Sequence, residues 1–122
     1  MTASDGFAAF LAEQLEPLGD LMFRRMFGKT GVFCHGLMFA MVADDTLYVR
    51  IDAENRGALA EAAETAPLSY EKQGRSIDLA FWAVPERLLD EREALLTWAR
   101  LALGAAGRVA AQRPVRRLRA LG

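Results

Sequence analysis

The spacing of apolar residues along the chain predicts where its helices and strands lie. Near the N-terminus, apolar residues recur every three or four positions from Phe7 onward. Ser4 or Asp5 stands just before this run, where a helix cap belongs. Pro17 and Gly19 follow it, and both disfavour further helix. The pattern therefore predicts a first helix between these signals.

The middle of the chain alternates between apolar and polar residues with a period of two, as strands do. The near-continuous apolar run at 37–42 indicates a central strand that is covered on both faces. Asp44 and Asp45 are suited to a tight hairpin turn. The pattern predicts one antiparallel meander of three strands, at 21–27, 31–43 and 46–52.

The second half of the chain predicts two helices on either side of a hairpin. Alanine, glutamate and leucine dominate 53–66, and a leucine stripe marks a helical region at 86–106. Strands at 68–72 and 75–83 are expected to form the hairpin. The element order α-β-β-β-α-β-β-α indicates an α+β fold in two layers, with a mainly antiparallel sheet and helices on one face.

The composition indicates one globular domain in a reducing compartment. The chain has 122 residues, of which 52% are hydrophobic and 25% charged. Cys34 is the only cysteine, so no internal disulfide forms. The N-terminus lacks a basic leader, and no window reaches the ~18 apolar residues needed to cross a bilayer. The expected location is the cytoplasm, without membrane contact.

Charge is unevenly distributed along the chain. All sixteen acidic residues lie at or before Glu93, whereas residues 107–122 carry five arginines and no acid. This contrast divides the chain into a domain, 1–106, and a basic C-terminal tail, 107–122. The tail either complements the end of a helix or contacts anions, as weak DNA contact or on an acidic partner. The candidate anion contacts are Arg108, Arg113, Arg116, Arg117 and Arg119.

The stretch GKTG at 28–31 resembles two nucleotide-related motifs without meeting the requirements of either. A phosphate loop needs a glycine where Phe23 stands, and a helix after the loop, whereas a strand is predicted here. The GXXG loop of KH domains joins two helices, and predicted strands flank this stretch. We interpret it as a hairpin turn that uses glycine at positive φ.

Cys34 and His35 are the other candidates for chemistry. Neighbours in a strand point to opposite faces, so the pair does not converge on a metal or act as nucleophile and base. His35 is also the only histidine. The acidic residues form no recognisable catalytic pair. No catalytic, cofactor or metal site is predicted, and an enzyme ranks third, after two binding functions.

Three arginines lie within strand patterns, namely Arg24, Arg25 and Arg50. A buried arginine needs a partner, so we expect Arg50 to pair with Asp52 or Asp78. Tyr48, Arg50 and Asp52 share one face of the predicted strand 46–52. That face is expected to lie away from the helices, where a partner could bind.

Residues 24–52, RRMFGKTGVFCHGLMFAMVADDTLYVRID, resemble the signature of the TfoX/Sxy N-terminal domain. Residues 68–100 are similar to its second half, with Val-Pro-Glu before a leucine-rich helix. The resemblance covers roughly residues 7–106. The family-motif and interaction positions that it marks are Arg24, Arg25, Met26, Phe27, Gly28, Gly31, Met38, Phe39, Tyr48, Arg50 and Asp52.

The resemblance implies a two-layer α+β fold like that of secretion chaperones, with no catalytic residues and no cofactor. It also implies a role in transcription and natural competence through a protein partner such as the cyclic-AMP receptor protein. The alternative is a homodimeric chaperone-like or adaptor module with no role at promoters. Tyr48, Trp82 and the strand edges would supply the dimer contact.

Overall fold

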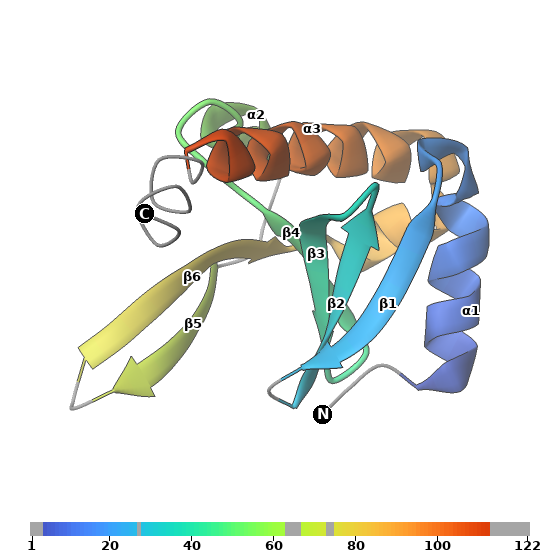
Figure 1. Ribbon diagram of the computed structural model, residues 1–122, viewed down its shortest axis with the longest axis horizontal. Helices are drawn as coiled ribbons and strands as arrows, with labels where there is room; N and C mark the ends of the chain where they lie inside the picture. Colours follow the sequence, from blue (N-terminus) through green and yellow to red (C-terminus); the bar gives the residue numbers. More distant parts are fainter. Residues whose placement is uncertain (1–3, 27, 63–66, 73–74, 113–122) are drawn as a thin grey trace, which may run out of the picture.

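Six antiparallel strands form one sheet in the part of the chain that the structure describes (Figure 1). The computed structural model describes residues 4–26, 28–62, 67–72 and 75–112, and their side chains except those of 60–79. The strand order is β1-β2-β3-β4-β6-β5, and every pairing is antiparallel. The strands are β1 (Leu21–Met26), β2 (Lys29–Cys34), β3 (Leu37–Ala43), β4 (Thr46–Arg50), β5 (Pro67–Lys72) and β6 (Arg75–Ala83). The predicted α+β fold is confirmed.

The helices are α1 (Asp5–Gln14), α2 (Arg56–Ala62) and α3 (Arg92–Ala111), with short 3-10 helices η1 (Glu16–Leu18) and η2 (Glu86–Asp90). Ser4 caps α1, because its hydroxyl oxygen accepts a hydrogen bond from the Phe7 backbone N–H at 3.2 Å. This confirms the expected start of the first helix. Pro17 lies in η1, and Gly19, with φ of 122°, caps the end of this 3-10 helix.

The single strand expected at 31–43 is wrong, because the structure has a hairpin there. β2 ends at Cys34 and β3 begins at Leu37. His35 and Gly36 form the turn, with φ of 51° and 80°. The strands on both sides of this turn are apolar, so the hydrophobic pattern indicated one continuous strand. The predicted three-stranded meander is therefore a meander of four strands, β1 to β4.

The long C-terminal helix differs from the expected helical region 86–106 at both ends. A 3-10 helix occupies its first five residues, and α3 itself begins at Arg92. At the other end α3 continues to Ala111, past the boundary at residue 106, because its alanine-rich last turns favour helix. No helix within the described ranges is long and apolar enough to span a membrane.

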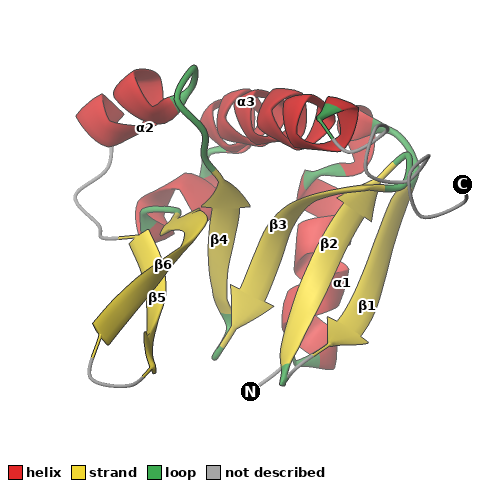
Figure 2. Cartoon of the chain, turned by 60° about the vertical axis from the view of Figure 1, so that its left-hand side comes forward, coloured by secondary structure: helices red, strands yellow, loops and turns green. Residues whose placement is uncertain are grey.

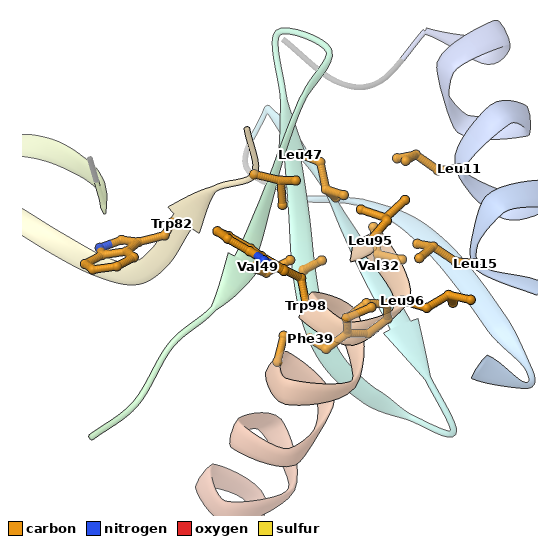
Figure 3. Close-up of a cluster of buried hydrophobic side chains, with 14 of the residues drawn as sticks. Leu11, Leu15, Val32, Phe39, Leu47, Val49, Trp82, Leu95, Leu96 and Trp98 are labelled. Carbon is orange, nitrogen blue, oxygen red and sulfur yellow. The ribbon is translucent and has the colours of Figure 1, made fainter. Parts of the chain in front are cut away.

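The core lies between one face of the sheet and the helices α1 and α3, which Figure 2 shows behind β1 to β4. In Figure 3, side chains from α1, α3 and the strands meet in this layer. Its largest fully buried side chains include Leu11, Leu15, Phe39 and Leu95. Trp82 also joins the core and is only 9% exposed, so it does not form the exposed dimer patch that the sequence suggested.

Polar contacts fix the end of α1 against the start of α3. The Arg92 guanidinium donates hydrogen bonds to the carbonyl oxygens of Glu13 and Gln14, at 3.0 and 3.2 Å. The Gln14 side-chain amide donates to the Leu89 carbonyl at 2.7 Å. The last carbonyls of α1 lack partners within the helix, so these contacts satisfy them while they join the two helices.

Candidate functional site

One face of the sheet is uncovered by helices in the described part of the chain and is rich in methionine. The helices α1 and α3 both cover the opposite face (Figure 2). We call the uncovered surface of β1 to β4 the methionine face. Its apolar side chains are Met22, Met26, Phe33, Met38, Met41 and Tyr48. Its cationic side chains are Arg24, Lys29 and Arg50.

The register of the strands places these side chains in rows across the sheet. Met22 lies opposite Phe33, which in turn lies opposite Met38. The next row runs through Arg24, Gly31, Met41 and Tyr48. Directly opposite residues share a face, so the two rows form one continuous surface. Met22 is 46% exposed, the most exposed large apolar side chain among the described residues.

Gly31 lies at the centre of the methionine face, and its neighbours converge on it. A Cβ atom there would lie 2.9 Å from Met38 Sδ, 3.1 Å from Phe33 Cε1 and 3.5 Å from Met26 Sδ. The absent side chain thus leaves a recess that two thioethers and an aromatic ring fill. This gives a physical reason for glycine at a position that the family motif marks.

A cavity of about 370 Å³ adjoins the methionine face at the start of β3. On the sheet side it is lined by Met26, Phe33, Met38 and Arg50. On the helix side, the C-terminal turns of α3 line it through Ala106, Val109 and Ala110. The extension of α3 past residue 106 thus supplies part of this wall.

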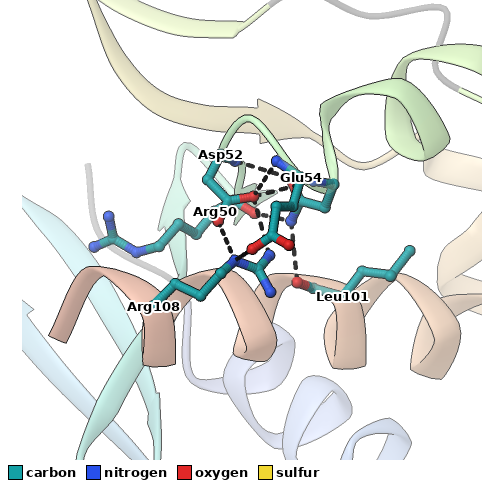
Figure 4. Close-up of polar contacts among 6 residues, drawn as sticks. Arg50, Asp52, Glu54, Leu101 and Arg108 are labelled. Atoms are coloured by element: carbon teal, nitrogen blue, oxygen red, sulfur yellow. Dashed lines mark hydrogen bonds and ion pairs between the residues drawn. The ribbon is translucent and has the colours of Figure 1, made fainter. Parts of the chain in front are cut away.

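Arg50 is held by the backbone of β3 and by an aromatic ring. Its Nε–H donates a hydrogen bond to the Met38 carbonyl at 3.1 Å. Its guanidinium lies 4.6 Å from the centre of the Phe81 ring, within the range of a cation–π contact. The side chain points away from Asp52 in Figure 4, so the expected Arg50–Asp52 pair is wrong. The side chain of Asp78, the other expected partner, lies outside the described residues.

Asp52 instead joins the end of β4 to α3 through Arg108 (Figure 4). Arg108 donates to the two carboxylate oxygens of Asp52, at 2.5 and 3.0 Å, and its Nε lies 2.6 Å from Glu54. Because β4 ends at Arg50, Asp52 lies in the turn before α2 and does not share a strand face with Tyr48. Arg108, expected as an anion contact, already binds two carboxylates of its own chain.

Asn55 completes this junction and is only 2% exposed. Its side-chain oxygen accepts from the Asp52 backbone N–H at 2.8 Å. Its amide donates to the carbonyl oxygens of Arg50 and Leu101, at 3.2 and 3.0 Å. Sequence reasoning missed this residue. The Asp-X-X-Asn spacing before α2 was the available signal, since both side chains favour turns at helix starts.

Asp52 gives the protein a pH dependence in the acid range. The hydrogen bond from Arg108 is the main reason why the pKa of Asp52 lies below its ordinary value. A lowered pKa in the folded state means that the carboxylate stabilises the fold fully above about pH 3.9, its unfolded value. This contribution is lost as the pH falls through the lower, folded-state value.

We therefore expect Asp52→Asn to lower the urea midpoint at neutral pH and to reduce the further loss of stability in acid. Asp90→Asn, the same chemical change at an exposed position, is the control and should leave the midpoint nearly unchanged. Urea titrations monitored by tryptophan fluorescence at several pH values measure both effects. A difference between wild type and Asp52→Asn that stays constant into acid would contradict the role of this carboxylate.

The remaining motif residues lie in different parts of the structure and do not form one site. Arg25 pairs with Thr30, so its exposed side chain lies on the opposite face of β1 from Arg24. Phe39 is fully buried in the core. Gly28 has φ of 74° in the turn between β1 and β2, which matches the expected glycine turn, although β2 already begins at residue 29. Outside the described residues lie Phe27, Arg113, Arg116, Arg117 and Arg119.

Cys34 and His35 lie in different environments. Cys34 is fully buried, and its thiol donates to the Leu18 carbonyl at 3.5 Å. Burial, together with the nearby charge of Asp20, raises the pKa of the thiol, which opposes a reactive thiolate. His35 is exposed in the turn. Among the described residues, no group of three or more His, Cys, Asp or Glu side chains is placed to hold a metal ion.

Comparison with known proteins identifies the family to which this chain belongs. The family model of the TfoX N-terminal domain matches residues 13–106. Protein Sxy of Escherichia coli (strain K12) is 32% identical over 94 residues, which cover 77% of this chain. The match spans 44% of the length of that relative. Residues 13–106, which the family model matches, contain the whole methionine face and the Asp52–Asn55 turn.

Proposed function

Because the chain belongs to the TfoX N-terminal domain family, we propose that it is a non-enzymatic regulator that acts through contact with another protein. The process that it regulates would be transcription, and the genes would be those of natural competence or a related response. The proposal includes a cytoplasmic location. A transcription regulator such as the cyclic-AMP receptor protein is the proposed partner, since a DNA-bound regulator would supply the sequence specificity.

The methionine face is the observation that carries this proposal. It places Met22, Met26 and Phe33 on a sheet surface that the described helices leave uncovered. Contiguous apolar surface of this kind is typical of protein contact sites. The motif residues Arg24 and Tyr48 lie on the same surface, which links the face to the signature of the family.

Direct DNA contact is a weaker part of the proposal. Arg108 is engaged by Asp52 and Glu54, so contact with phosphates would rely on the other four tail arginines. The sixteen acidic residues of the preceding domain oppose the approach of DNA. We propose that any such contact is weak, depends steeply on salt and serves only to support the protein contact.

Transcription in a purified system tests the regulatory role. We expect the chain to change transcription by about fivefold or more from a promoter that the cyclic-AMP receptor protein activates, the lower range of coupling between binding sites. A promoter without the receptor site is the control and should not respond. Unchanged transcription from both promoters, together with a dimer mass in light scattering, would favour the chaperone-like or adaptor function instead.

A further inference from the structure

We propose that the methionine face is the docking site for an amphipathic partner segment that presents apolar anchors flanked by carboxylates. This inference deepens the proposed function and rests on it, because it assigns the surface and the partner chemistry of the protein contact. The apolar surface, the central recess and the charge of the face each support it.

The apolar part of the face is made largely of methionine. Of the five methionines in the chain, four point to this side of the sheet, namely Met22, Met26, Met38 and Met41. Met22 is 46% exposed, Met26 and Met38 are half-buried, and Met41 is buried at 8% exposure. Methionine has an unbranched side chain and a polarisable sulfur, so it repacks around different apolar partners at little cost. Such surfaces are typical of proteins that bind the apolar side of an amphipathic segment.

The recess at Gly31 gives the partner a place for an anchor side chain. The thioethers of Met26 and Met38 lie over this glycine, and Phe33 flanks them. Rotation of these flexible side chains would open the space above the glycine backbone. The adjoining cavity of about 370 Å³ extends the same space toward Val109 of α3. An apolar side chain of the partner could therefore be buried in the recess, while neighbouring anchors lie along the cavity.

The charge of the methionine face indicates which side chains should flank the apolar anchors of the partner. Arg24, Lys29 and Arg50 lie on it, and none of the described side chains of β1 to β4 on this face is a carboxylate. Carboxylates on the partner would complement Arg24 and Lys29, whereas Arg50 already contacts the Met38 carbonyl and the Phe81 ring. A second copy of the chain is disfavoured as the occupant, because two methionine faces in contact would bring like charges together.

A nucleic acid would use such a face differently. Proteins that bind bases on a sheet stack them on exposed aromatic rings. Here Phe81 is only 3% exposed beneath Arg50, and Tyr48 is half-buried beside Met41. The most exposed apolar side chain of the face is a methionine, Met22, which suits apolar side chains of a protein better than base rings.

The test is a titration of the full chain, labelled with ¹³C at its methionine methyl groups, with two synthetic helical peptides. Both carry the same leucine anchors at i, i+3, i+4 and i+7, and they differ only in glutamate or lysine at the flanking positions. We expect the glutamate peptide to shift the signals of Met22, Met26 and Met38 with micromolar affinity. The lysine peptide should bind about tenfold more weakly or worse.

Two variants on one strand provide matched controls. Arg24→Glu reverses a charge on the methionine face and should weaken binding of the glutamate peptide by about tenfold while it strengthens binding of the lysine peptide. Arg25→Glu makes the same change on the opposite face of β1 and should leave both affinities within about twofold. Both positions are exposed, so each variant should fold, and circular dichroism is the measurement that checks this.

Several results would overturn the proposal. These are methyl signals that neither peptide shifts, a lysine peptide that binds as tightly as the glutamate peptide, and equal effects of the two charge reversals. Stronger shifts with oligothymidylate would indicate a nucleic-acid surface, and shifts on concentration of the protein alone would indicate a second copy. Unaltered methyl signals together with a normal transcription response would leave the regulatory function standing and reject this docking site alone.

Discussion

Replacing Phe39 with alanine is expected to lower the free energy of unfolding by about 3–5 kcal/mol. The Phe39 ring is fully buried, and it packs in the layer between the sheet and α3 (Figure 3). The register between β2 and β3 shifts at this point, so that Phe33 lies opposite Met38 and Val32 opposite Ala40. Phe39 is the extra residue of this β-bulge. A smaller side chain would leave a cavity that the bulged backbone cannot easily close.

Phe33→Ala is the matched control, because it removes the same ring from the neighbouring strand on the methionine face. Phe33 is half-buried, so we expect a cost of about 1–2 kcal/mol. Urea denaturation monitored by tryptophan fluorescence measures both values. In the peptide titration we expect the opposite order of effects. Phe33→Ala should weaken binding of the glutamate peptide more than Phe39→Ala does, when only the folded fraction of Phe39→Ala is counted. Equal losses of stability would contradict the assignment of Phe39 to the core.

The second large effect is expected at Asn55, where alanine should cost about 2–4 kcal/mol. The Asn55 side chain satisfies three backbone groups in a place that water barely reaches: the Asp52 N–H and the carbonyls of Arg50 and Leu101. Its removal leaves these groups without their partner and loosens the attachment of β4 and α2 to α3. Thermal and urea unfolding of Asn55→Ala measure the loss.

Two further variants separate hydrogen bonding from side-chain volume. Asn55→Asp keeps the shape but places an oxygen against the two carbonyls, so we expect a loss at least as large as that of Asn55→Ala. Glu54→Ala removes the neighbouring carboxylate, whose side chain is 67% exposed, and should change the stability by less than about 0.5 kcal/mol. A stable Asn55→Asp variant would show that packing alone explains the role of Asn55.

The sequence predicted the fold where local signals and the hydrophobic period agree. The cap at Ser4, the turn at Asp44 and Asp45, and the alternation of β4 all lie where they were expected. The prediction failed at His35 and Gly36, where the turn separates two strands that are both apolar. Histidine is enriched at positive φ and glycine favours it, so His35-Gly36 was the available turn signal. The apolar residues on both sides of the pair outweighed this signal.

The candidate site was only partly predictable, because it depends on pairings between distant strands. The family motif includes Arg24, Gly31 and Met38, but only the strand register shows that they share one face of the sheet. The partner of Asp52 could not be inferred either, since Arg108 lies 56 positions away on α3. A long separation in sequence leaves many possible ion pairs open, and the packing of the helix on the sheet selects one of them.

The position of β1 at the edge of the sheet has a consequence for solubility. Its outer backbone groups face away from β2, and an exposed strand of this kind can pair with the same strand of another molecule and start aggregation. Arg24 and Arg25 place one positive charge on each side of this edge. Two such strands that approach each other would repel on both surfaces. The adjacent arginines therefore protect the protein against uncontrolled sheet growth while they leave the apolar face beside them accessible.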